Sequence, residues 1–454
     1  MRSEPVKVFG LAIIALTAVG RIQAEPKEAA ALSPHFRGQI TDASVLRPPA
    51  SPSPDDVDLA AMAKAATNYL RGNPDPKRDY ECKWSLGPLG IPAFVPLLPS
   101  TKDAADPISL ADTDCRMDWQ YPHMRAMAGE KQSDEVEQGV RGRILGYQRA
   151  DHLVWSNPAA WTGPDDAVTE DWASTWASAK LLYSLSETYE RTHDKAVADQ
   201  ARKILLALGS LAKWDGPRAY YPGGPAPWKD GQWLGRGKGW GEVHRHNYPF
   251  VVEPAVRYFE CTGDKGGLEL ARAFTEGFLA GSQPDMGEQR IDPMTGAFKQ
   301  HVHIHTHAIW GVAHLGTVLN EPRYLDYARK AYDFVVANGT DYGWYPEFIP
   351  QSEYRTEICV VGDMVSTAAW LARGSRPHYW DHVERTVRNE LHKSQFFLTP
   401  AFVKLSRKYT RPKLRRSLMG HWPSCASSKV ASSPSRHLTI GSVIRTIRGS
   451  ARPA

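Results

Sequence analysis

Apolar residues recur at helical spacing from about Asp134 onward, in paired runs that are joined by short polar turns. The turns fall at residues 192–194, 262–264, 319–322 and 374–377. An arginine occupies an equivalent place after each turn, and these arginines (Arg202, Arg272, Arg329 and Arg385) lie 70, 57 and 56 residues apart. The pattern predicts repeated helical hairpins, which either stack into an open solenoid or close into a toroid.

Long loops rich in Trp, Gly and His separate the hairpins, at residues 214–247 and 282–307. Solenoid repeats have short, uniform connections, whereas long loops at one mouth of a toroid build binding sites. The sequence therefore predicts an all-α fold, an (α/α)6 toroid of helical hairpins. We count about ten helices, in five hairpins, before residue 397. This is one hairpin fewer than a ring of six, so we expect the toroid to be incomplete at its C-terminus.

The N-terminal segments differ from this pattern. Residues 1–24 combine Arg2 and Lys7 with a short apolar run and small residues, which is typical of a secretory signal peptide. We therefore expect a secreted or periplasmic protein, without a segment apolar enough over its length to span a membrane. Residues 25–55 are a Pro/Ala/Ser-rich linker, a first helix is predicted at 56–71, and residues 81–121 are predicted to be irregular.

The last part of the chain breaks the helical pattern. Residues 398–454 contain twelve Lys and Arg but no Asp or Glu. We expect this tail to be either disordered or the result of a reading-frame slip near Phe397. Without it the chain carries 43 basic and 50 acidic residues, a formal charge of −7. The helical-hairpin domain at 56–397 therefore offers no electrostatic basis for nucleic-acid binding.

The five cysteines are too few and too scattered for a disulfide scaffold, although Cys82 and Cys115 could form one bridge in an oxidising compartment. The sequence contains no phosphate-binding loop, no nucleophile elbow and no paired CxxC motif, so a nucleotide site and a Ser or Cys hydrolase triad have no support. The 15 tryptophans suit either platforms under sugar rings or a large helical core.

An aromatic, Pro-containing turn carries the first candidate site. Glu347 follows Trp344 on this turn, and a carboxyl beside aromatic rings at the toroid mouth suits a general acid for glycosidic cleavage. Glu357 and Cys359 flank the start of the next helix, and a carboxylate and a thiolate two residues apart can ligate one zinc ion. The structural alternative is that Glu357 is an acid at a helix N-terminus and Cys359 a small core residue.

Four alternating histidines form the second candidate site. His301, His303, His305 and His307 would all point to one side of a strand. Such an array can bind a metal ion, but without a carboxylate among them the imidazoles equally suit a polar site for sugar. A helix is predicted to begin at His307, so the alternation is expected to end there.

Two further clusters are weaker. Residues 240–247 include His246, whose ring nitrogens suit sugar hydroxyls because these need both donors and acceptors. Asp114, Asp118 and Trp119 form the other cluster. For both, a solvated loop is the structural alternative.

The segment GWYPEFIPQSEYRTEIC at residues 343–359 resembles the active-site stretch of the β-L-arabinofuranosidases of glycoside hydrolase family 127 and of related exported proteins. The resemblance implies an (α/α)6 toroid followed by β-sandwich material, and a carbohydrate substrate. It also implies that Glu347 is the acid/base and that Glu357 and Cys359 are zinc ligands. His307, and more loosely His246, resemble sugar-contacting histidines of the family.

The resemblance spans about residues 110–397, and the chain departs from the family beyond them. In the family two adjacent cysteines complete the zinc site and one of them is the nucleophile, but this chain has only Cys425 beyond residue 400. It therefore resembles the front part of such an enzyme. Three functions stay open: a glycoside hydrolase, a toroid polysaccharide lyase that abstracts a proton next to a uronate, and a truncated, non-catalytic glycan-binding protein.

Overall fold

The computed structural model describes residues 57–86, 91–94, 110–130, 135–156, 171–221, 228–229, 232–233, 235–236, 248–281, 290–351 and 356–394. The predicted signal peptide (1–24), linker (25–55) and basic tail (398–454) lie outside these residues, and they stay predictions. Among the described helices, none combines the length and the apolar character needed to cross a membrane.

The four hairpins predicted at the turns 192–194, 262–264, 319–322 and 374–377 are confirmed, each as two helices joined by a turn of two to five residues. They are α7 (Thr175–Thr192) with α8 (Lys195–Ser210), α9 (Val252–Thr262) with α10 (Lys265–Leu279), α11 (Val302–Leu319) with α12 (Pro322–Ala337), and α13 (Ile358–Arg373) with α14 (Tyr379–Thr386). A π-helical turn (Val387–Leu391) and α15 (His392–Ser394) follow the last hairpin.

Three of the turns share one construction, which explains why the sequence shows them so clearly. The first helix ends at a residue in the left-handed conformation, and the next residue is an acid whose carboxylate accepts a backbone N–H of the second helix. The left-handed residues are His193, Gly263 and Asn320, and the acids are Asp194, Asp264 and Glu321. Each turn therefore ends one helix and starts another within two residues.

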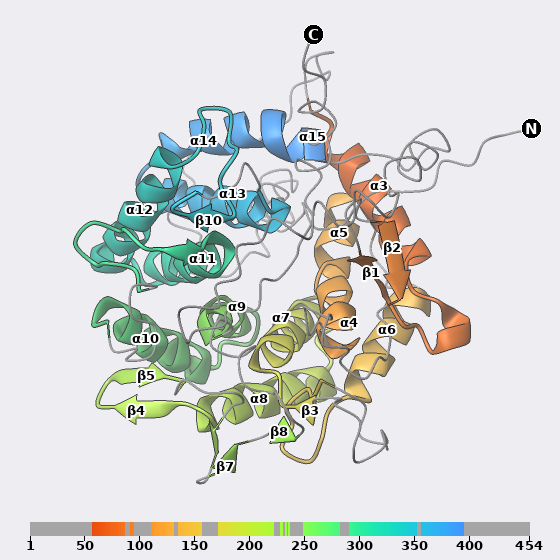
Figure 1. The fold of residues 1–454 in the computed structure, drawn as a ribbon. Coiled ribbons are helices and arrows are strands. Elements are labelled where there is room, and N and C mark those ends of the chain that lie inside the picture. Colours follow the sequence, from red (N-terminus) through yellow and green to blue (C-terminus); the bar gives the residue numbers. More distant parts are fainter. Residues whose placement is uncertain are drawn as a thin grey trace, which may run out of the picture.

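The hairpins curve around a common centre. Figure 1 shows α7, α9, α11 and α13 on the inside and α8, α10, α12 and α14 on the outside. Successive inner helices contact each other in the order α4 (Leu110–Asp118), α7, α9, α11 and α13. The protein is thus an all-α toroid of helical hairpins, as the sequence predicts.

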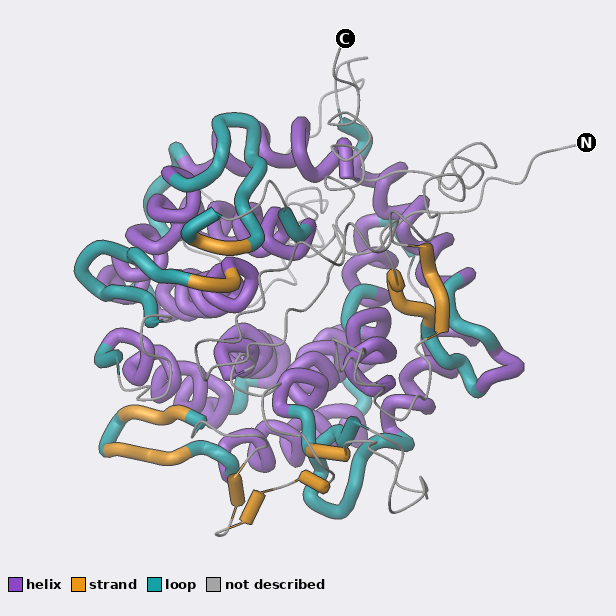
Figure 2. The backbone as a smooth tube through the Cα atoms, viewed as in Figure 1, coloured by secondary structure: helices purple, strands orange, loops and turns teal. Residues whose placement is uncertain are grey.

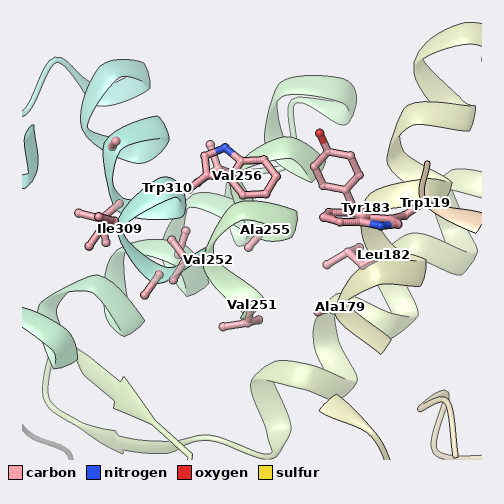
Figure 3. Close-up of a cluster of buried hydrophobic side chains, with 14 of the residues drawn as sticks. Trp119, Ala179, Leu182, Tyr183, Val251, Val252, Ala255, Val256, Ile309 and Trp310 are labelled. Carbon is pink, nitrogen blue, oxygen red and sulfur yellow. The ribbon is translucent and has the colours of Figure 1, made fainter. Parts of the chain in front are cut away.

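Inner and outer helices differ in how much of their surface is buried. All residues of α11 from Val302 to Thr317 are buried, and so are those of α13 from Ile358 to Ala372. The outer helices bury only one stripe, because their other face meets solvent. Figure 3 shows part of the resulting core, where Val252 of α9 and Ile309 of α11 belong to one buried cluster.

The N-terminal part of the ring contains α3 (Leu59–Gly72), α4, α5 (Tyr121–Met127), α6 (Glu135–Leu145) and a short 3-10 helix (Pro76–Arg78). The prediction that residues 81–121 are irregular was wrong, because they include the antiparallel hairpin β1 (Lys83–Leu86) and β2 (Ile91–Phe94) as well as α4. The sequence hides α4 because its acids are buried and paired: Asp114 binds Arg143, and Asp118 binds Arg141. The solvated-loop alternative for Asp114, Asp118 and Trp119 was therefore also wrong.

The possible bridge between Cys82 and Cys115 is not formed, and both thiols are free and buried. The chain around Cys82 is instead held by Asp114, whose Oδ1 accepts the backbone N–H of Cys82 at 3.0 Å. A side-chain carboxylate thus fastens this segment to α4 without a disulfide.

The remaining strands form short antiparallel pairs in the segments that connect the helices (Figure 2). They are β3 (Asp171–Trp172) with β8 (Gly235–Arg236), β4 (Lys213–Asp215) with β5 (Arg218–Tyr220), β6 (Trp228–Lys229) with β7 (Gln232–Trp233), and β9 (Gln300–His301) with β10 (Phe348–Ile349). A 3-10 helix (Tyr248–Val251) leads into α9. The β9–β10 pair matters most here, because it joins the chain before α11 to the chain before α13.

Candidate functional site

The β9–β10 pair brings Glu347 against the start of α11. Phe348 is paired with His301, and the carbonyl of Glu347 accepts the backbone N–H of Val302 at 2.9 Å. Glu347 precedes β10 in a loop, as expected from its turn, and only 1% of the residue is exposed. A backbone ladder therefore fixes the position of this buried carboxyl relative to α11.

Glu357 and Cys359 approach the same place from the start of α13. The Nε2 atom of His301 lies 2.7 Å from Oε2 of Glu357, and Sγ of Cys359 lies 3.6 Å from that oxygen. Glu357 occupies the N-cap position, but its side chain makes no capping hydrogen bond. The carboxylate of Glu357 therefore does not cap α13 and contacts His301 instead.

Three of these side chains have the geometry of a metal site. His301, Glu347 and Glu357 each offer one ligand atom, and the three atoms lie within 4.8 Å of one another. Cys359 adds a sulfur beside Glu357, and zinc accepts nitrogen, oxygen and sulfur ligands. Burial raises the pKa of the Cys359 thiol well above its usual range, so zinc would have to displace its proton. The donor set of this site fits zinc.

The histidine array does not lie in a strand beyond His301. The helix α11 begins at Val302, five residues earlier than predicted, so the expected alternation was wrong for the remaining histidines. In a helix, residues four apart share a face. His303 and His307 accordingly meet one carboxylate: Asp363 lies 2.7 Å from Nδ1 of His303 and 3.3 Å from Nδ1 of His307.

His305 lies on a different face of α11. Its ring stacks on Phe298 with the ring centres 4.0 Å apart, and its Nδ1–H donates to the carbonyl of His301 at 2.7 Å. This histidine therefore braces the first turn of α11, and it does not share the carboxylate that His303 and His307 contact.

Burial keeps both inward-facing histidines neutral. Desolvation lowers the pKa of His303 to about 3 and that of His307 to about 4. Desolvation also raises the pKa of Asp363, although its hydrogen bonds from His307 and Thr306 oppose this. At neutral pH the two imidazoles offer hydrogen bonds without adding charge to the interior.

The inner helices contribute two further charged residues that the sequence analysis missed. Asp363 lies within the apolar run of α13, and Lys180 lies within the buried part of α7. The signal that could have found them is a lone charge inside an otherwise apolar helix, because such a charge is rarely buried without a function or a partner.

Two predicted site residues remain, Trp344 and His246. Trp344 is buried, and its backbone N–H donates to Oγ1 of Thr340 at 3.1 Å within the loop after α12. His246 lies outside the described residues. Their predicted contacts with sugar, like those of His303, His305 and His307, stay predictions.

No known protein-family profile matches the chain, and no curated protein matches its sequence. Solved structures do match. A GH76 α-mannanase from Bacteroides thetaiotaomicron is 15% identical with a TM-score of 0.47, over 82% of this chain and 88% of that one. A GH127 β-arabinofuranosidase is 16% identical with a TM-score of 0.46, over 65% of this chain and 47% of that one. A polysaccharide lyase is 12% identical with a TM-score of 0.41, over 82% of this chain and 91% of that one.

These likenesses are distant, with TM-scores below 0.5. The fold is therefore stated from the helices of the chain itself, and the activity has to be argued from its site. The chain also spans less than half the length of the GH127 enzyme, so that enzyme's activity does not transfer to it.

Proposed function

We propose that the protein is a glycoside hydrolase that acts on oligosaccharide or polysaccharide, with Glu347 as the general acid/base. The observation that carries this proposal is the pair of buried carboxyls, Glu347 and Glu357, which both lie close to the ring of His301. Paired carboxyls are the groups that most glycoside hydrolases use to break the glycosidic bond.

The chemistry follows from this pair. Glu347 would donate its proton to the glycosidic oxygen as the bond to the anomeric carbon breaks, and the leaving sugar would depart as an alcohol. Water would then add to the anomeric carbon and return a proton to Glu347. One ligand atom of Glu347 and one of Glu357 lie within 4.8 Å of each other, so both carboxyls can act on the same bound sugar.

We also propose a zinc ion, held by Glu357, Cys359 and His301. The resemblance of residues 343–359 to family 127 supports the first two ligands, and the contact between His301 and Glu357 supports the third. When bound, zinc would act as a Lewis acid and keep Cys359 as a thiolate. The test is metal analysis of the purified chain, in which Glu357→Gln and Cys359→Ser should each lose zinc that the parent retains.

The proposed function is tested with Glu347→Gln, which keeps the shape of the side chain but cannot donate a carboxyl proton. We expect kcat on a cleaved glycan to fall by about 10²–10⁴-fold, with the same thermal unfolding profile as the parent. Glu269→Gln, at an exposed position of α10, is the matched control and should retain full activity. Unchanged turnover in Glu347→Gln would contradict the proposal.

Two other outcomes assign the open alternatives. Products with the ultraviolet absorbance of an unsaturated uronate would identify a polysaccharide lyase, because elimination creates a double bond and hydrolysis does not. Calorimetric binding of oligosaccharides without turnover would identify a non-catalytic glycan-binding protein.

A further inference from the structure

Lys180 extends from α7 into a box of aromatic rings inside the toroid. Its Nζ atom lies 3.5 Å from the centre of the Trp119 ring, 4.7 Å from that of Trp176 and 6.0 Å from that of Phe250. Only 6% of the residue is exposed. A buried ammonium over aromatic faces gains cation–π attraction, but this replaces only part of its lost hydration.

Within the described parts of the chain, Nζ of Lys180 makes no hydrogen bond and no ion pair. Lysine is rarely buried without a paired carboxylate. Asp363 acts on it only electrostatically and is already bonded by His303, His307 and Thr306. Desolvation and the nearby Arg116 hold the pKa of Lys180 well below its usual range, so an anion beside Nζ would favour the protonated, charged form of this side chain.

Arg116 brings a second cation to the same box. It comes from α4, and its guanidinium carbon lies 4.0 Å from the centre of the Trp176 ring that Lys180 also approaches. Two basic side chains thus approach one indole of the toroid interior. A carboxylate beside them would offset the repulsion between their charged forms.

The box adjoins the carboxyl site through a continuous set of rings. Phe250 stacks on His307 with ring centres 4.2 Å apart and lies 5.5 Å from His303. The rings of His303 and His301 are 6.1 Å apart, and His301 contacts Glu357. Figure 3 shows Trp119 and Trp310 of this region, contributed by different parts of the ring. A sugar bound beside the catalytic carboxyls therefore has the box as its neighbour.

We propose that Lys180 and Arg116 receive the carboxylate of a uronic acid, so that the substrate class is acidic glycans. Aromatic faces suit the apolar face of a sugar ring, and the two cations suit a charge attached to that ring. This inference rests on the proposed function for the identity of the neighbouring site. It goes further in naming which residues select the substrate and by what charge.

The test compares oligogalacturonides and oligoglucuronans with the same oligosaccharides after their carboxyl groups have been reduced to alcohols. Calorimetry on the full chain should show that the parent prefers the acidic form of at least one pair. Lys180→Met keeps the length of the side chain but removes its charge, and should weaken binding of the acidic form by about ten- to a hundredfold. Binding of the reduced form should not change.

Matched variants separate charge recognition from structure. Lys180→Arg keeps the charge and should restore much of the acidic preference. Lys203→Met makes the same substitution at an exposed position of α8 and should bind like the parent. Because Lys180→Met removes a buried amino group that has no paired carboxylate, it should unfold at the same temperature as the parent or higher.

The outcomes distinguish this inference from the proposed function. No binding of acidic glycans, or equal binding by the parent and Lys180→Met, would overturn the inference. Glu347-dependent cleavage of neutral glycans without acidic preference would overturn it while leaving the hydrolase intact. Lys180-dependent binding of acidic glycans without hydrolysis would support the inference and contradict the hydrolase, and an unsaturated product would then assign the lyase.

Discussion

At the scale of single residues, His314 shows how the toroid keeps polar groups in its core. Its Nδ1 atom lies 2.7 Å from Oε2 of Glu253, its Nε2 atom lies 3.1 Å from Oε2 of Glu260, and its ring stacks on Trp370. Burial alone would lower the pKa of His314, but the two carboxylates outweigh burial and raise it to about 8. The buried imidazole is therefore a cation at neutral pH.

This pKa predicts a pH dependence of stability. The folded-state pKa of His314 lies above its unfolded value of 6.5. The stabilisation that the protonated His314 gives the folded state is therefore fully present below about pH 6.5 and is lost as pH rises through about 8. A shift of this size corresponds to roughly 2 kcal/mol of unfolding free energy. Urea unfolding between about pH 6 and 9 should show this loss in the parent and a flatter profile in His314→Gln. His392→Gln, at an exposed position, should keep the slope of the parent, and a parallel slope in His314→Gln would contradict the assignment.

At the scale of elements, the sequence predicts hairpins well because their signals are local. A left-handed residue followed by a capping acid lies wholly within each turn, as in Gly263 and Asp264. The start of α11 could not be predicted in the same way. Its HVHIHTH segment alternates like a strand, and the pairing of His301 with Phe348 depends on a partner 47 residues away in the chain. Contacts at that range leave no local pattern.

The packing of one helix on another predicts a contrast between two helical glycines. A Cβ atom at Gly267 of α10 would overlap the carbonyl oxygen of Ala255 in α9, so Gly267→Ala should cost about 1–3 kcal/mol of unfolding free energy. A Cβ at Gly142 of α6 would meet nothing within 4 Å. Gly142→Ala should therefore stabilise the protein by about 0.5–1 kcal/mol, because alanine loses less backbone entropy in a helix. Denaturant titration checks both, and equal effects would show that α9 and α10 can separate without cost.

At the scale of the whole molecule, the sequence predicts the toroid but not which side chains the fold brings close together. Glu347, Glu357 and Cys359 are close in sequence, so one loop and one helix start suffice to suggest them. His301 and Asp363 join them only because α11 and α13 lie side by side. Lys180 comes from α7, more than a hundred residues earlier in the chain, and only the curved succession of inner helices brings it near the histidines.

A second cluster of charged residues, on α7 and α9, is the basis of the last prediction. Arg257 of α9 is 3% exposed and is paired with Glu187 and Glu190 of α7 and with Glu260 of its own helix. Because His314 of α11 also binds Glu260, this network connects three successive inner helices. Removing the guanidinium would leave carboxylates without compensation in the interior.

Arg257→Met should therefore reduce the unfolding free energy by about 3–5 kcal/mol, as is usual when one partner of a buried ion pair is removed. Arg202→Met is the matched control, because the side chain of Arg202 is 64% exposed in its ion pair with Asp264. This substitution should reduce the unfolding free energy by about 1 kcal/mol or less. Adding Glu187→Gln to Arg257→Met should recover part of the loss, since it removes one of the uncompensated charges. Urea unfolding of the four proteins measures these differences. Equal costs for the two arginines would show that the network does not hold the inner helices together, and that apolar packing alone does so.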